Sequence, residues 1–246
     1  MDTSREPQVI DTFLTLTDTL TRDFDAVDML TTLSENCVRL LDVSAAGVIL
    51  ADGRGGLSMA AASSERSRLL GIFAVAIDSG PCVDCVRIGE SVASDDLARA
   101  SARLRWPRYT AGAQDAGFRA THALPMRLRD EVIGVLTLLH TDRHTLTAED
   151  ARLGQALADA ATIGLMHERA IRRAEAVQEQ LQGALESRVI IEQAKGVLAG
   201  SSHLSPEAAF AVLRSHARAN GIRLTQLARD VVDGSIDFTS IIRPAL

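Results

Sequence analysis

The stretch that decides the architecture of the C-terminal part covers residues 184–233 and reads ALESRVIIEQAKGVLAGSSHLSPEAAFAVLRSHARANGIRLTQLARDVVD. Its apolar residues recur every three or four positions in three separate runs, which is the spacing of amphipathic helices. Ser205-Pro206 predicts the start of the second helix, because a serine hydroxyl caps free backbone N–H groups and proline suits the first helical position. Asn220-Gly221 predicts its end, and Thr225 is the expected cap of the third helix. The stretch therefore predicts three short helices, the first of which is ended by Gly200-Ser201-Ser202.

This stretch is basic within an acidic chain. The whole protein of 246 residues has a net charge of −6. Between residues 188 and 229, however, the only acidic residues are Glu192 and Glu207. The basic residues there are Arg188, Lys195, Arg214, Arg218, Arg223 and Arg229. A basic island on an acidic protein is one form that a nucleic-acid contact face takes, although charge alone equally fits a solvated helix face.

The run SRVIIEQAKGVL at residues 187–198 resembles the opening signature of an ANTAR domain. Later motifs match that family's pattern in order and spacing: SPEAAF at 205–210, Leu213-Arg214 and Ala217-Arg218. The resemblance implies a three-helix RNA-binding module of bacterial transcription antiterminators. It also implies that each protomer of a dimer binds one of two short stem-loops in a nascent mRNA, and that transcription machinery is affected only indirectly. We expect this domain over residues 185–240.

Seven residues are the expected RNA contacts: Arg188, Gln193, Lys195, Gly196, Arg214, Arg218 and Arg223. Arg188 and Lys195 are seven positions apart and therefore lie on about the same helix face. Arg214 and Arg218 are four positions apart and share a face of the second helix. Cations on one face suit phosphate groups, and a guanidinium also stacks on or hydrogen-bonds to an exposed base.

The preceding part of the chain alternates helical and β patterns after an expected flexible tail over residues 1–8. Helical spacing is expected over about 9–41 in two helices and over 64–77, and β runs are expected at 46–51, 57–62, 120–126 and 132–140. This order predicts an α+β fold in which helices pack on a central antiparallel sheet.

Several short sequence motifs of this region resemble those of a GAF domain. They are Gly80-Pro81-Cys82 with Gly89-Glu90, Asp96-Leu97, Trp106-Pro107, Leu124-Pro125-Met126 and residues 131–136, EVIGVL. The resemblance implies a sensor domain over residues 9–165 that holds a small-molecule ligand in a pocket beside its sheet. It does not identify that ligand, because the fold serves many. A GAF sensor joined to an ANTAR output is a recurrent bacterial architecture.

Between the two domains, residues 166–184 predict a coiled-coil linker helix. Thr147 and Asp150 resemble a capping box that starts this helix further back. A heptad seam then follows, made of Leu153, Leu157, Ala160, Gly164, His167, Ile171, Ala174, Gln178, Leu181 and Leu185. It is apolar except at His167 and Gln178, and these two residues and Gly164 are its weak positions. An exposed seam of this kind needs a partner, and a second copy of the chain is the simplest one. We therefore expect a homodimer formed through the linker helix.

Cys82 and Cys85 are the candidate redox or ligand-sensing residues. Two thiols three positions apart near a helix start can form a redox pair or half of a zinc site, but small buried cysteines fit the same pattern. No second cysteine pair completes a metal site, so no metal is expected. His167 on the linker fits a seam position better than a phosphoacceptor, because no nucleotide-binding domain follows it.

We predict no enzymatic activity, since no catalytic or nucleotide-binding motif occurs in the sequence. The polar N-terminus and the absence of a long apolar run predict a cytoplasmic protein without membrane contact. The favoured function is an RNA-binding antiterminator under the control of a GAF sensor. The alternatives are a DNA-binding regulator with the same sensor and a GAF-fold sulfoxide reductase that uses Cys82 and Cys85.

Overall fold

The computed structural model describes residues 6–17, 25–52, 54–202, 204–237 and 241. The chain divides into two compact units, Met1–Ala170 and Ile171–Leu246, and each has its own hydrophobic core. Residues 1–5 of the expected tail lie outside the described residues. Residues 6–8, also assigned to that tail, instead form the first turn of helix α1 (Glu6–Thr17).

The N-terminal unit is built on a sheet that has five strands in the described part of the chain. The strands are β1 (Ala45–Ala51), β2 (Leu57–Ala62), β3 (Val92–Ser94), β4 (Ala120–Leu128) and β5 (Glu131–His140). Their order across the sheet is β2-β1-β5-β4-β3, and every neighbouring pair is antiparallel. The predicted antiparallel sheet is therefore confirmed, with β5 at its centre and β2 and β3 at its edges.

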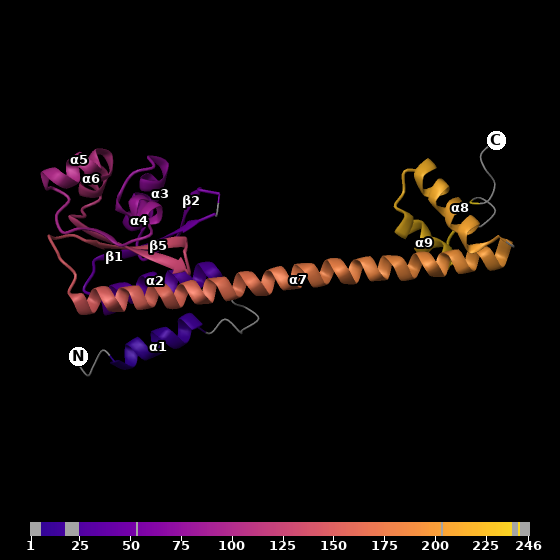
Figure 1. The fold of residues 1–246 in the computed structure, drawn as a ribbon, viewed down its shortest axis with the longest axis horizontal. Helices are drawn as coiled ribbons and strands as arrows, with labels where there is room; N and C mark the ends of the chain where they lie inside the picture. Colours follow the sequence, from indigo (N-terminus) through magenta and orange to yellow (C-terminus); the bar gives the residue numbers. More distant parts are fainter. Residues whose placement is uncertain (1–5, 18–24, 53, 203, 238–240, 242–246) are drawn as a thin grey trace. The chain divides into compact units, whose positions relative to one another are not determined.

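Helices cover both faces of this sheet, as Figure 1 shows. On one face lie α2 (Ala26–Leu40) and the first part of α7 (Ala148–Ser202), and α1 packs against α2 on the same side. On the other face lie α3 (Glu65–Ala76), α4 (Pro81–Ile88), α5 (Ala100–Arg105) and α6 (Pro107–Asp115). No helix of the described residues is by itself long and apolar enough to span a membrane, and α3 and α4 reach that threshold only as a pair bent by 58°.

The central strand supplies side chains to both layers. In β5, Leu136 and Leu138 belong to the core under α2 and α7, whereas Val135 and Leu139 belong to the core under α3 to α6. The eight residues from 133 to 140 are all buried. A strand that is buried on both faces requires a nearly continuous apolar run, and IGVLTLL provides it.

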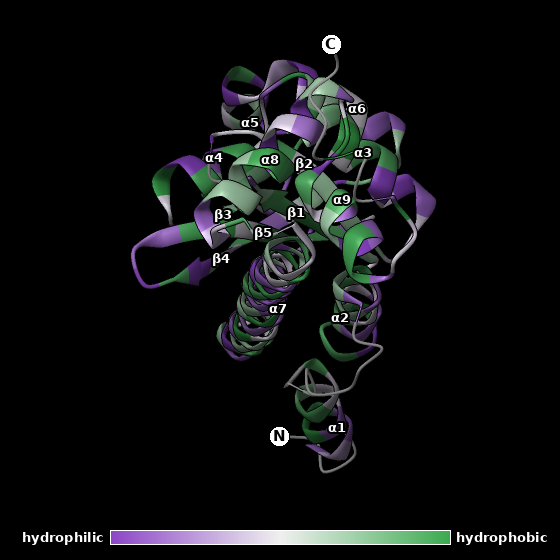
Figure 2. Cartoon of the chain, turned by 90° about the vertical axis from the view of Figure 1, so that its right-hand side faces the viewer, coloured by the Kyte–Doolittle hydropathy of each residue, from purple (hydrophilic) through white to green (hydrophobic). Residues whose placement is uncertain are grey.

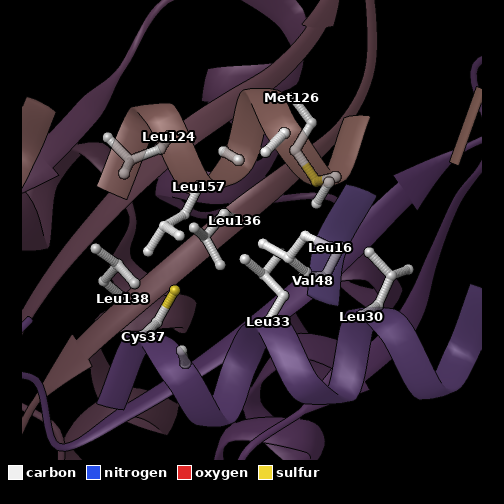
Figure 3. Packing of buried hydrophobic residues seen from close by; sticks show 14 of the residues in the cluster. Leu16, Leu30, Leu33, Cys37, Val48, Leu124, Met126, Leu136, Leu138 and Leu157 are labelled. Carbon is white, nitrogen blue, oxygen red and sulfur yellow. The ribbon is translucent and has the colours of Figure 1, made fainter. Parts of the chain in front are cut away.

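Helix α7 packs directly on the sheet through its first turns. Figure 3 shows Leu157 of α7 and Leu33 and Cys37 of α2 pointing toward the β5 leucines Leu136 and Leu138. Leu157, Leu33 and Cys37 have no exposed surface. A Cβ on Gly154 would lie 2.9 Å from Leu124, so the glycine allows α7 to approach β4 closely. The start of the predicted seam, including Leu157 and Ala160, is therefore covered by its own chain and not by a second copy.

Both ends of α7 follow the sequence prediction. The Asp150 N–H donates to the Thr147 hydroxyl at 3.0 Å, and that hydroxyl donates to the Asp150 carboxylate at 2.7 Å, as the capping pattern predicted. At the other end, the sequence predicted a stop at Gly200-Ser201-Ser202, and α7 ends at Ser202. The helix is unbroken over its 55 residues, and near its end the Ser201 hydroxyl donates to the Val197 carbonyl at 2.9 Å.

Because Leu157 is fully buried against the sheet, we expect Leu157→Ala to lower the free energy of unfolding by about 3 kcal/mol through lost burial and a cavity. Ile163→Ala is the matched control on the same helix, because Ile163 is 62 % exposed. We expect that control to change stability by less than about 0.5 kcal/mol. Urea denaturation of the two variants measures the difference, and equal effects would show that α7 does not pack on the sheet through Leu157.

Candidate functional site

The C-terminal unit consists of the end of α7, α8 (Pro206–Ala219) and α9 (Leu224–Val232). Its core is made mainly of alanine and leucine: Ala194, Leu198, Ala209, Leu213, Ala217, Leu227, Ala228, Val231 and Ile241 are buried. Small side chains at helix contacts allow the axes to approach closely. The larger polar and basic side chains of the three helices are consequently left on the surface.

The limits of α8 agree with the sequence signals, and the start of α9 does not. The Ser205 hydroxyl accepts a hydrogen bond from the Ala208 N–H at 3.2 Å, with Pro206 as the first helical residue. Gly221 adopts a positive φ of 63° at the expected stop. Helix α9, however, begins at Leu224 with Arg223 as its N-cap residue. Thr225 lies inside the helix because the Arg223 carbonyl already accepts from the Leu227 N–H at 3.1 Å.

Lys195 joins α7 to α8 through two contacts. Its ammonium group donates to both carboxylate oxygens of Glu192, at 2.9 and 2.8 Å. It also lies 5.7 Å from the centre of the Phe210 ring, within cation–π range. Only 19 % of the Lys195 side chain is exposed. The predicted RNA contact at Lys195 is thus held in place by an acid on its own helix and an aromatic ring on the next.

The contact between Lys195 and Phe210 defines a larger surface. Phe210, Arg214 and Arg218 follow one another at four-residue spacing and therefore lie along one face of α8. Arg188 lies two turns from Lys195 on the same face of α7. We call these five residues of α7 and α8 the basic face. The three arginines are exposed, and Phe210 is half-buried. The structure therefore brings four of the predicted contacts onto one face.

Phe210 is the member of this surface that sequence reasoning missed, because its spacing placed it in the core face of α8. The structure leaves it outside the buried cluster of Ala209, Leu213 and Ala217. The signal that could have identified it is the row of Phe210, Arg214 and Arg218, in which an aromatic residue continues a line of cations.

The remaining predicted contacts lie at other places on this unit. Gln193 lines a groove of about 340 Å³ between α7 and α9, together with Val189, Ile190 and Arg229. Gly196 is exposed on α7, but as the residue after Lys195 it is rotated by about 100° around the helix axis from Lys195. Arg223 is exposed at the start of α9. These three residues therefore do not extend the basic face.

An apolar row runs along the part of α7 that belongs to the C-terminal unit. Val177, Leu181, Leu185 and Val189 follow at four-residue spacing, and each side chain is more than half exposed. Figure 2 shows apolar and polar residues alternating around this helix. The row shares Leu181 and Leu185 with the predicted seam, whereas Val177 and Val189 were not part of that prediction.

The N-terminal unit contains a small cavity between the sheet and helices α3, α4 and α6. Its volume is about 10 Å³, which is room for roughly one water molecule. It is lined by Gly47, Ile49, Met59, Ser67, Leu70, Gly71, Ala74, Cys82, Tyr109, Thr137 and Leu139. Such a volume is far below the several hundred Å³ of an open ligand pocket.

Cys82 lies at the start of α4 and Cys85 one turn later, and both are free thiols with almost no exposed surface. Burial raises the pKa of each thiol to about 12 and outweighs the backbone N–H groups that lower it at Cys82. Since the thiolate is the reactive form, these two thiols are poorly suited to redox exchange at neutral pH. Cys82 instead forms part of the cavity wall.

Two family models match the chain. The GAF domain model matches residues 25–166, which is more than half of the protein. The chain belongs to the GAF domain family. The ANTAR domain model matches residues 179–232. The predicted combination of a GAF domain and an ANTAR domain is therefore confirmed, and these names are used below for the two units.

Solved structures that resemble the chain share the GAF fold. The GAF domain of an Acinetobacter phosphoenolpyruvate-protein phosphotransferase is 12 % identical, with a TM-score of 0.53, covering 70 % of this chain and 98 % of the other. The free methionine-R-sulfoxide reductase of Neisseria meningitidis, in complex with its substrate, is 15 % identical, with a TM-score of 0.51 and coverages of 68 % and 91 %. Identities this low show the fold alone. No curated protein matches the sequence.

Three histidines of the GAF domain meet where the sheet leads into α7. The rings of His140 and His144 are stacked with centroids 4.0 Å apart, and His122 meets His140 edge-on at 5.6 Å. The Leu146 N–H donates to His122 Nε2 at 3.5 Å, so the neutral imidazole holds the segment that precedes α7. Stacked rings do not converge on one ion, and no group of three or more metal-ligating side chains among the described residues is arranged to hold a metal.

The histidine cluster predicts that stability falls in acid. Burial, followed by repulsion from His144 and His122, lowers the pKa of His140 from its ordinary value of 6.5 to about 4. Burial also lowers the pKa of His122, against the opposing effect of Asp95. The unfolded chain then binds more protons than the folded chain as pH falls below 6.5, so stability is present above that pH and decreases toward pH 4.

We expect the Tm to fall between pH 7.5 and pH 5 in the wild type and to fall less in His140→Leu, which has one buried imidazole fewer. Differential scanning calorimetry over this range measures both slopes. Identical slopes in the two proteins would show that the buried, neutral His140 does not cause the loss of stability in acid.

Proposed function

We propose that this protein is an RNA-binding transcription antiterminator whose ANTAR domain binds tandem stem-loops in nascent mRNA under the control of its GAF sensor domain. The observation that carries the proposal is the basic face, where a half-buried aromatic ring lies in line with two exposed arginines on α8. Single-stranded loops are bound by cations that contact phosphates and by aromatic rings that stack on bases, and this face offers both. A bound pair of stem-loops prevents a competing terminator hairpin from forming, so transcription continues.

Each residue of the basic face has a distinct part in this proposal. Arg188, Arg214 and Arg218 are exposed, so their guanidinium groups are free to reach phosphates or bases. Phe210 supplies the stacking surface. Lys195 holds Phe210 in position and adds a positive charge, while its bonds to Glu192 fix its own place. Gln193, Gly196 and Arg223 remain proposed contacts on neighbouring surfaces of the domain.

We expect Arg214→Ala/Arg218→Ala to weaken binding to a two-hairpin RNA by about tenfold or more. The slope of log affinity against log salt concentration should fall in magnitude by about 1 to 2, because binding with fewer phosphate contacts releases fewer counterions. Phe210→Leu keeps an apolar side chain but removes the ring, and should weaken binding at every salt concentration with little change of slope. Fluorescence anisotropy in a salt series measures both quantities.

Arg54→Ala/Arg108→Ala is the charge-matched control, because it also removes two charges and both arginines are exposed on the GAF domain. It should leave RNA affinity unchanged. A duplex DNA of the same sequence distinguishes the rival function, a DNA-binding regulator. Equal affinity for both nucleic acids, or equal affinity of all variants for the RNA, would contradict the proposal.

We also propose that the protein acts as a homodimer in the bacterial cytoplasm, joined through the apolar row of α7. Val177, Leu181, Leu185 and Val189 present one ridge on a helix, and a helix buries such a ridge by packing it against another helix. A dimer also explains how a single kind of ANTAR domain binds paired stem-loops. The proposed contact runs along the linker helix at residues 166–184, between sensor (9–165) and output (185–240), and continues into the start of the output through Leu185 and Val189.

Leu181→Asp/Leu185→Asp should convert the dimer to a monomer, because two carboxylates per chain would be buried in the interface. The control Ala176→Asp/Gln180→Asp adds the same charge on nearly the opposite face of α7 and should leave the dimer intact. Sedimentation velocity measures the oligomeric state. A wild-type monomer at micromolar concentration, or dissociation by both pairs of substitutions, would refute the proposed interface.

A further inference from the structure

The cavity of the GAF domain is small because the side chain of Met59 occupies the space beside it. Met59 lies on the edge strand β2 and reaches between two glycines of neighbouring elements. A Cβ on Gly47 of β1 would lie 2.8 Å from the Met59 methyl carbon, and a Cβ on Gly71 of α3 would lie 2.4 Å from its sulfur. Glycine is unfavourable in the middle of a strand or helix, so two such glycines around one side chain indicate space reserved for it.

A second feature directs Met59 into this space. The register between β1 and β2 shifts at Met59: Ile49 pairs with Met59 and Val48 pairs with Ala61, which leaves Ala60 as an extra residue. A bulge of this kind changes the direction of a neighbouring side chain, and bulges are frequent beside binding sites. Met59 is half-buried, so it lies between the cavity and the solvent.

The side chains around the cavity restrict what it can hold. No lining residue is charged at neutral pH, so a phosphate or carboxylate would enter without a counterion. The Thr137 hydroxyl is the polar group of the wall that is fully buried and has no hydrogen-bond partner among the described residues. Ser67, by contrast, already donates to the Ser64 carbonyl at 2.8 Å.

We propose that Met59 is a displaceable plug and that the sensor pocket takes a small, mainly apolar molecule with one hydrogen-bonding group, which pairs with Thr137. This proposal rests on the proposed sensor function and names its ligand class. Methionine suits the role, because its unbranched side chain fills irregular space and changes rotamer readily. When the Met59 side chain rotates toward solvent, the cavity is enlarged by the volume that this side chain occupied.

Phenol and toluene are the probes for this pocket, since they have the same shape and differ in one hydroxyl group. Wild-type protein with ¹³C-methyl methionine is titrated with phenol, and the signal of Met59 is assigned by its loss in Met59→Leu. The Met59 signal should move, and the signal of Met126, which is fully buried in the other core, should stay. Unchanged positions of both signals, or equal shifts of both, would overturn the proposal.

Truncation of the plug provides an independent measurement. In Met59→Ala the space is open, so phenol should raise the Tm by about 3–5 °C at ten times its Kd, and the volume-matched Met59→Leu should shift much less. If Met59→Ala does not fold, Met59→Val is the smaller β-branched replacement suited to a strand. No stabilisation of the truncated variant by either probe would overturn the proposal.

The Thr137→Val variant tests the ligand class. In Met59→Ala, phenol should bind about fivefold more tightly than toluene, and adding Thr137→Val should remove this difference. A preference for toluene, or a preference for phenol that survives Thr137→Val, would overturn the assignment of Thr137. RNA binding of the wild type without probe is measured beside these titrations, so that failure of the antiterminator function is distinguished from failure of the pocket.

Discussion

The N-terminal unit depends on covering both faces of one strand. The central residues of β5 are buried on each side, and β1 approaches so closely that a Cβ on Gly134 would lie 2.7 Å from the Ile49 carbonyl oxygen. Exposure of either face would place a row of leucines and valines in water. One cover is made by α3 to α6, and the other by α2 with the first turns of α7. The helix that continues into the ANTAR domain is therefore also a core element of the GAF domain.

The fold was largely predictable because its signals are local. Alternation and turn residues located β2 at its observed limits and β1 within one residue, and Ser205 and Gly221 marked the ends of α8. The end of α7 at Gly200-Ser201-Ser202 was also located correctly, whereas the start of α9 was predicted two residues late, because Arg223 and not Thr225 is its N-cap residue.

The sites were less predictable, because they combine residues that only the fold brings together. Phe210 has the spacing of a core residue and differs from its buried neighbours only in the direction it takes from α8. The position of Met59 between Gly47 and Gly71 could not be predicted, because these two glycines belong to two other elements, β1 and α3. For Cys82 the sequence left open a reactive thiol or a small buried cysteine; in the structure the side chain is buried, and removal from water raises its pKa.

The bulge at Ala60 has a second consequence, which concerns the edges of the sheet. An open, regular edge strand presents unsatisfied N–H and C=O groups that recruit strands from other chains and lead to aggregation. Here one edge, β2, is irregular at Ala60, and the other, β3, has only three residues. Neither offers a long straight template. The same distortion that lies beside Met59 therefore makes β2 a poor template for pairing with strands of other chains.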